Sequence, residues 1–67
     1  MNRASYRAGV AWIADNDEAE CLDPDAVAYF ITSLLLADLF GVEPERVGRD
    51  VVRKRKQLAK SESKVSP

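Results

Sequence analysis

Residues 36–51 read LADLFGVEPERVGRDV, and this stretch decides the fold because it contains a helix end, a tight turn and a helix start. Gly41 follows an apolar run and can adopt the positive φ that ends a helix. Pro44 suits the first position of the next helix, where its missing N–H would have had no partner. Ala37 is small enough for two helices to cross closely, and Val47 should fill the angle between them. The stretch therefore predicts two helices packed at an angle.

The apolar run before the turn predicts one helix over residues 24–40. Asp23 can accept a hydrogen bond from a free N–H of the first turn, and Pro24 suits the first helical position. Ser33 could instead cap a new helix and split the segment, but neither proline nor glycine interrupts it between residues 26 and 40. We therefore favour one helix. Because it is apolar nearly all round, it should be central and covered by its neighbours.

Two further helices complete an all-α domain, one over residues 3–15 and one over residues 44–60. Their apolar positions recur at helical spacing, which is the main sequence signal for an amphipathic helix. These positions are Tyr6, Val10 and Ile13 in the first helix, and Val47, Val51 and Leu58 in the last. The three helices form a single domain over residues 1–60, and the polar residues 61–67 are expected to be a disordered tail.

The composition argues against catalysis and against a membrane span. The chain has 67 residues, no histidine and one cysteine, Cys21, so it lacks the commonest general base and cannot form an internal disulfide. It also lacks a metal-ligand cluster, a phosphate-binding glycine loop and a nucleophile–base pair, so we expect a non-enzymatic binding protein without a cofactor. The single cysteine fits a reducing, cytoplasmic setting. The apolar runs are far shorter than the roughly 20 residues that span a bilayer.

The net charge of −1 conceals two halves of opposite sign, because residues 1–40 carry −5 and residues 41–67 carry +4. Positive side chains spaced for one face of the last helix are Arg46, Arg49, Arg53, Lys56 and Lys60. Such a row can hold phosphates and read guanine edges, so the first four are candidate contacts to duplex DNA. The other interpretation is a solvated surface, which charge runs often are.

The stretch also resembles a known family. Its pattern Phe-Gly-Val-x-Pro-x-x-Val-x-Arg-Asp-Val, residues 40–51, is similar to the helix-turn-helix of DeoR-type bacterial transcription regulators. The resemblance implies that the helix from Pro44 enters the DNA major groove. The positions it places on the groove or phosphate side are Arg46, Gly48, Arg49 and Arg53. The pattern departs from the family at Glu43, Glu45 and Val52, where neutral or polar hydrogen-bonding residues are usual. A simple corner between two helices would need the same glycine and small residues.

The chain as a whole is similar to short, uncharacterised proteins of phages and plasmids. The residues that carry this similarity are 6–7, 12–14, 16–17 and 37–41. It implies a bacterial mobile-element origin, and small acidic proteins from such sources include anti-CRISPR inhibitors. The alternative function is therefore an inhibitor or adaptor that binds a host protein or nucleoprotein complex through an apolar or acidic surface. The acidic candidates are Asp15, Asp17, Glu18 and Glu20.

A homodimer is expected because the helix over residues 24–40 has more apolar surface than two flanking helices can cover. The candidate interface residues are Leu34 and Leu35 from that helix, and Trp12 from the first helix. Trp12 lies about 200° around its helix from Val10. Either the first helix is buried broadly or Trp12 anchors a partner, and burial is slightly favoured.

Overall fold

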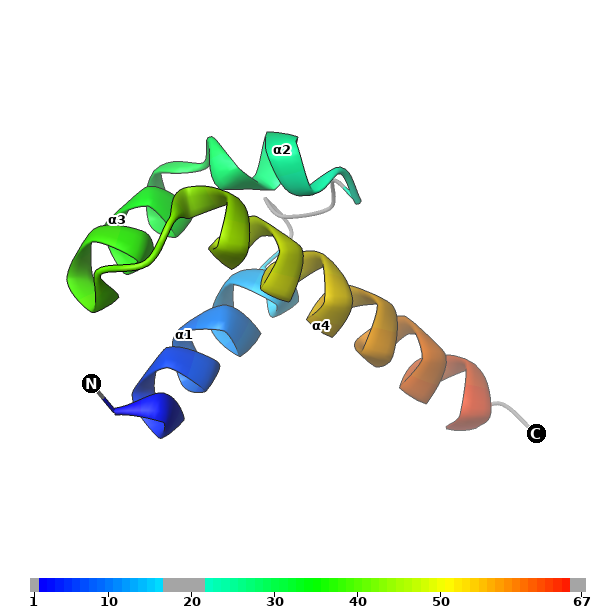
Figure 1. The fold of residues 1–67 in the computed structure, drawn as a ribbon. Helices are drawn as coiled ribbons and strands as arrows, with labels where there is room; N and C mark the ends of the chain where they lie inside the picture. The colour runs from blue at the N-terminus through cyan, green and yellow to red at the C-terminus, as the bar shows by residue number, and fades with distance from the viewer. Residues whose placement is uncertain (1, 17–21, 66–67) are drawn as a thin grey trace.

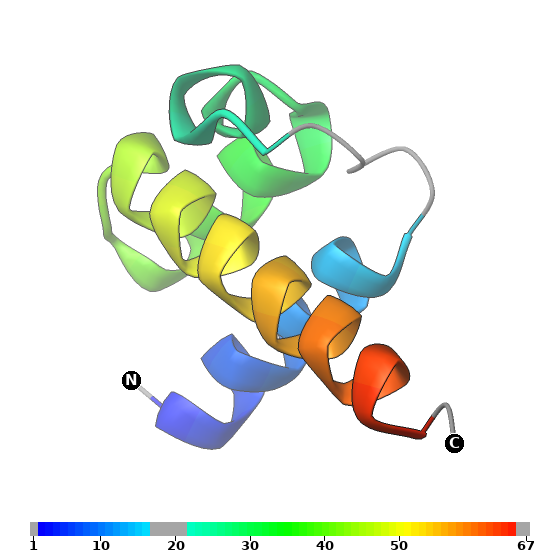
Figure 2. The same ribbon diagram turned by 90° about the vertical axis from the view of Figure 1, so that its right-hand side faces the viewer.

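The computed structural model describes residues 2–16 and 22–65, and within them the chain forms helices and no strands. The elements are α1 (Arg3–Asp15), α2 (Pro24–Ala28), α3 (Ile31–Phe40) and α4 (Pro44–Val65). Helix α4 lies between α1 on one side and the α2–α3 pair on the other (Figures 1 and 2). The all-α class is confirmed, while the predicted number of three helices is wrong.

The prediction of one helix over residues 24–40 fails at Tyr29 and Phe30. Phe30 has φ −65° and ψ 139°, an extended conformation that ends α2 and allows α3 to start in a new direction. Ser33 does not cap the new helix, because it lies inside α3 and is fully buried. The break has a tertiary cause: α2 and α3 both pack against α4 (Figure 1). A straight helix about 25 Å long could not follow both contacts.

The predicted start of α2 and the predicted end of α3 are confirmed. Asp23 caps α2, with its Oδ1 accepting from the Asp25 N–H at 3.1 Å, and Pro24 occupies the first helical position. Gly41 ends α3 with φ 64° in the left-handed region. Beyond it, the Val42 N–H donates to the Ala37 carbonyl at 3.0 Å, which satisfies a carbonyl of the last turn. These local signals act within one helical turn, so the sequence alone locates them.

The central helix is α4, and not the segment 24–40 as predicted. The side chains of Val47 and Val51 are completely buried where α1, α2 and α3 meet α4. In contrast, Ile31, Leu35 and Leu39 of α3 are 75%, 64% and 76% exposed. The remaining buried apolar residues are Val10, Ile13, Ala14, Val27, Ala28, Ala37 and Val52. The core is therefore built from small and β-branched side chains, while several of the largest apolar residues remain outside it.

The last helix is longer than predicted, because α4 continues to Val65 and not only to residue 60. Residues 61–65, expected to belong to a disordered tail, have helical backbone at the end of α4, and residues 66–67 lie outside the described residues. Neither glycine nor proline occurs between residue 49 and Pro67, so no strong helix breaker interrupts this stretch. The C-terminal part of α4 extends beyond the other helices (Figure 1).

Candidate nucleic-acid interface

The exposed side of α4 carries a row of positive charge, which we call the basic face. Its members are Arg46, Arg49, Arg53, Lys56 and Lys60, and all five are exposed. The opposite side of the helix carries Val47 and Val51, which are fully buried. The packing of α4 thus leaves the four candidate DNA contacts on one solvent-facing side. The same side begins with an exposed carboxylate, Glu45, in the first turn.

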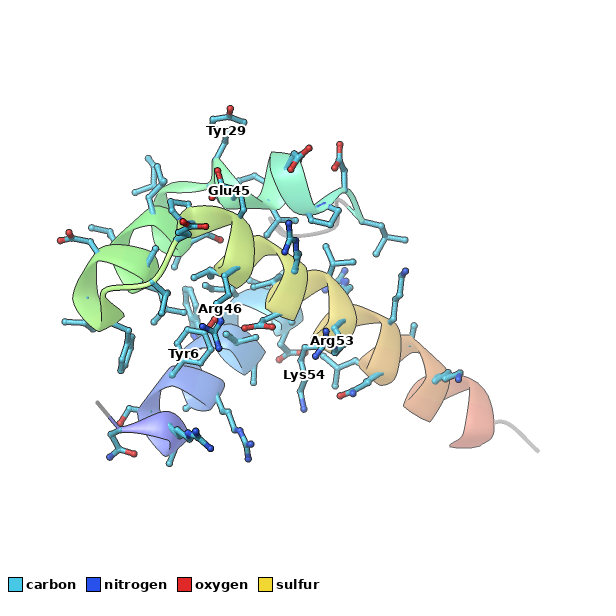
Figure 3. The ribbon with its side chains drawn as sticks, viewed as in Figure 1. Tyr6, Tyr29, Glu45, Arg46, Arg53 and Lys54 are labelled. Carbon is cyan, nitrogen blue, oxygen red and sulfur yellow. The ribbon has the colours of Figure 1, made fainter. Side chains whose placement is uncertain are left out.

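A groove of about 740 Å³ runs between α1 and α4, and we call it the basic groove. Five of its lining side chains are basic: Arg3 and Arg7 from α1, and Arg46, Arg53 and Lys54 from α4. The labelled side chains of Arg46, Arg53 and Lys54 lie toward α1 in Figure 3. Arg46 and Arg53 belong to both the basic face and the groove, whereas Arg49 and Lys56 do not line the groove. The two surfaces can therefore be tested separately.

Asp50 is the one acidic residue among the described residues that line the groove, and it is bound by Tyr6. The Tyr6 hydroxyl donates to Asp50 Oδ2 at 2.6 Å, which joins α1 to α4 across 44 positions of sequence. The Tyr6 ring packs edge-on against Phe40, with centroids 5.5 Å apart. Burial raises the pKa of Tyr6 to about 12. The hydrogen bond to Asp50 and the negative charge of Asp50 contribute to the rise, whereas the positive charge of Arg46 lowers the pKa. Tyr6 is therefore a protonated donor at neutral pH.

Arg55 has a structural role that distinguishes it from its basic neighbours. Its guanidinium Nη1 donates to the main-chain carbonyl of Ala14 in the last turn of α1. A positive charge at this end of a helix is favourable, because the last carbonyls carry partial negative charge. The half-buried Arg55 thus holds α1 against α4 and is not part of the basic face.

Two positions that the helix-turn-helix resemblance relates to DNA lie in the protein interior. Gly48 was expected on the groove or phosphate side, but it is buried against α2. A Cβ at residue 48 would lie 2.3 Å from the Pro24 carbonyl oxygen, so only glycine fits this helix crossing. Val52, where the family pattern has a polar residue, is 6% exposed and belongs to the core. Its apolar character is therefore explained by packing.

Arg3 and Arg7 are the site residues that the sequence analysis missed. Their four-residue spacing places both on one side of α1, which was the available signal. They belong to the half of the chain with net negative charge, so the charge of that half did not indicate a basic surface there. Only the packing of α1 along α4 brings them beside Arg46 and Lys54.

A second surface is apolar and lies where α1 meets α3. Trp12 is 60% exposed, so its expected burial is wrong. Two hollows of about 220 and 240 Å³ share Trp12 as a lining residue, one extending to Ile31 and the other to Leu35 and Leu39. We call these four residues the apolar surface. Of the expected interface residues, Trp12 and Leu35 thus lie together, while Leu34, 42% exposed, lines neither hollow.

The acidic candidates are described only in part. Asp15 is exposed in the last turn of α1. The other three, Asp17, Glu18 and Glu20, lie outside the described residues.

Comparisons with models of protein families, with curated proteins and with solved structures found no match to this chain. Within residues 2–16 and 22–65, no helix is both long enough and apolar enough to cross a membrane. The two basic surfaces and the apolar surface are therefore the features of the molecule that bear on its function.

Proposed function

We propose that this protein is a small DNA-binding regulator whose α4 contacts duplex DNA through Arg46, Arg49, Arg53 and Lys56. The observation that carries the proposal is the exposure of all four side chains on one side of a helix whose other side is in the core. The major groove of B-DNA is about 12 Å wide and admits an α-helix. The Gly41 turn supports the proposal, because it joins α3 to α4 in the manner that a helix-turn-helix requires.

Most of the affinity should come from phosphates. Arg46 and Lys60 are about 21 Å apart along the helix axis, at about 1.5 Å per residue. A row of this length is suited to follow the DNA backbone, and each neutralised phosphate releases condensed counterions. Binding should therefore weaken steeply with salt. Glu45, exposed in the first turn, should oppose binding because it brings a carboxylate toward the same backbone.

The test measures anisotropy of a labelled duplex at several salt concentrations, with the parent protein, Arg49→Gln and Arg49→Lys. Arg49 is chosen because it lies on the basic face but not in the groove. The Gln variant should bind more weakly and flatten the salt slope by about one unit. The Lys variant keeps the charge, so it should retain phosphate binding and lose only bidentate reading of a base. No binding by the parent at low salt, or an unchanged Arg49→Gln variant, would refute the proposal.

We also propose that the domain forms a homodimer through the apolar surface. Its four large apolar side chains are between 60% and 76% exposed. Exposed apolar side chains gathered in one patch mark a protein–protein interaction site, and a second copy of the same chain can cover the patch through a symmetric contact. A symmetric dimer would also present two copies of α4 to a two-fold DNA site.

Sedimentation of the parent, Leu35→Gln and Leu22→Gln tests the dimer. Both variants replace an exposed leucine with the same amide, but Leu22, 56% exposed, lines neither of the two hollows that share Trp12. We expect Leu35→Gln to dissociate the dimer and Leu22→Gln to leave it intact. A monomeric parent at high micromolar concentration would contradict self-association and would assign the apolar surface to a different protein.

The second candidate function is a protein-binding inhibitor or adaptor, and the exposed Trp12 favours it because tryptophan is frequent in binding hot spots. This function predicts no duplex binding at any salt concentration. It also predicts that partner binding depends on Trp12 or on the acidic residue Asp15. Loss of partner capture in Trp12→Ala, together with a parent that does not bind DNA, would favour it over the first proposal.

A further inference from the structure

We propose that the basic groove between α1 and α4 holds the sugar–phosphate backbone of one nucleic-acid strand, with Arg3 and Arg7 forming the α1 side of the site. This inference rests on the proposed function and extends it to a second element. The DNA-binding surface would then include two helices. Helix α4 would contact bases or phosphates, and α1 would contact the backbone of one strand.

The size of the groove suits part of a nucleic-acid strand. A space of about 740 Å³ lies within the range of roughly 300–1,000 Å³ that is typical of small-molecule sites, so it can hold a few linked sugars and phosphates of one strand. Positive side chains gathered in a concave site concentrate their field and attract anions. With five basic residues and one acidic residue lining it, the groove has a net charge of +4.

The spacing of the positive groups suits a phosphodiester chain. Arg46 and Arg53 are about 10 Å apart along α4, at about 1.5 Å per residue. One strand of a duplex advances about 3.4 Å per phosphate, so this distance corresponds to about three phosphates. Arg3 and Arg7 are about 6 Å apart on α1, which faces the same groove. Guanidinium groups bind phosphates with two parallel hydrogen bonds, and four of the five basic residues are arginines.

The contact between Tyr6 and Asp50 positions α1 in this site. Tyr6 lies between Arg3 and Arg7 in sequence, so its 2.6 Å hydrogen bond to Asp50 and its packing on Phe40 hold the α1 side of the groove against α4. Asp50 also places a carboxylate among the phosphate-binding groups, which should weaken the binding of any anion. Neutralising Asp50 should therefore strengthen binding, provided that the ligand lies in the groove.

The experiment compares Asp50→Asn with Asp38→Asn. Both variants remove one negative charge, but Asp38 is exposed on α3 and does not line the groove. The amide introduced by Asp50→Asn retains an oxygen that can accept from Tyr6, and thermal melting verifies that both variants fold. We expect Asp50→Asn to bind a labelled duplex about two- to fivefold more tightly, the effect of one charge a few ångström away in water. Asp38→Asn should remain close to the parent.

A second pair, Arg7→Gln and Arg7→Lys, tests the α1 side. The dependence of duplex affinity on salt should be about 0.9 units less steep for the Gln variant than for the parent. Its loss of affinity between 50 and 200 mM salt should therefore be about threefold smaller. The Lys variant should recover that slope, because counterion release depends on charge. Each protein is also titrated with a single strand of the same length, and with polyglutamate as a carboxylate competitor.

The outcomes separate this inference from the proposed function. Duplex binding that responds to Arg49→Gln but not to Arg7→Gln or Asp50→Asn would overturn the groove site and leave the proposed function standing. If the parent does not bind duplex, the proposed function fails, and single-strand binding that depends on Arg7 supports the groove alone. Failure to bind either nucleic acid overturns both. Displacement of the strand by polyglutamate at equal charge concentration would identify carboxylates as the ligand and overturn the inference.

Discussion

Replacing Gly48 with alanine gives opposite results depending on whether residue 48 faces DNA or α2. In an exposed helix interior, alanine is more favourable than glycine by about 1 kcal/mol. A groove-facing Gly48→Ala variant would therefore be more stable than the parent. In the structure, the new Cβ would lie 2.3 Å from the Pro24 carbonyl oxygen and 3.1 Å from the Ala28 nitrogen. These are main-chain atoms, so the overlap is relieved only by moving α2 away from α4.

The size of the effect follows from these two terms. Overpacking of this kind costs about 1–3 kcal/mol, occasionally more. Because the nearest atoms belong to the main chain, we take the upper end and subtract about 1 kcal/mol for helix propensity. The net loss of about 2 kcal/mol is a substantial part of the roughly 3–10 kcal/mol expected for a domain of this size. The melting temperature should fall by about 8–16 °C, since 1 kcal/mol corresponds to about 4–8 °C in small domains.

Urea unfolding followed by circular dichroism measures this change, with Gly9→Ala as the matched control. Gly9 is also in a helix, but the atom nearest to its added Cβ is the Leu36 Cδ1 at 2.7 Å, the end of a flexible side chain. The helix-propensity gain and the small rearrangement of Leu36 should nearly cancel. A Gly48→Ala variant that is as stable as the parent would refute the close contact between α2 and α4. It would indicate that residue 48 lies on the exposed side of α4.

Three further predictions concern the turn, the core and the link between α1 and α4. Gly41→Val should destabilise the domain by about 1–3 kcal/mol, because a β-branched residue is strained at φ 64°; an unchanged melting temperature would contradict the turn assignment. Ser33→Ala should raise the melting temperature, because the fully buried Ser33 Oγ has no hydrogen-bond partner among the described residues and a buried unpaired hydroxyl costs about 1–3 kcal/mol; a loss of stability would mean that Oγ is paired. The Tyr6 pKa rises from its ordinary 10.0 to about 12 on folding, so its contribution is complete below pH 10 and is lost as the pH rises from 10 to 12. Tyr6→Phe should show a smaller loss of stability than the parent across that range in alkaline unfolding, and identical pH profiles would refute the burial and the hydrogen bond that raise the Tyr6 pKa.

The ends of the helices around the turn could be predicted because their causes are local. Each of these ends depends on groups within one helical turn, so residues adjacent in sequence contain the information. The ends are the Asp23 cap, the end of α3 at Gly41 and the start of α4 at Pro44. The basic face was predictable for a similar reason, since a helix places residues three, four and seven apart on one side. Residue spacing alone does not determine whether solvent, DNA or another helix lies against that side.

Tertiary packing decided the features that local signals leave open. Phe30 adopts an extended conformation although no proline or glycine is nearby, because separate helices follow α4 better than one straight helix. The sequence alone cannot show whether Gly48 faces DNA or a neighbouring helix, because that depends on where α2 lies. Arg7 similarly joins a basic groove only because α1 packs along α4, although it belongs to the acidic half of the chain. Helix ends are decided within a turn, whereas contacts between helices depend on residues distant in sequence.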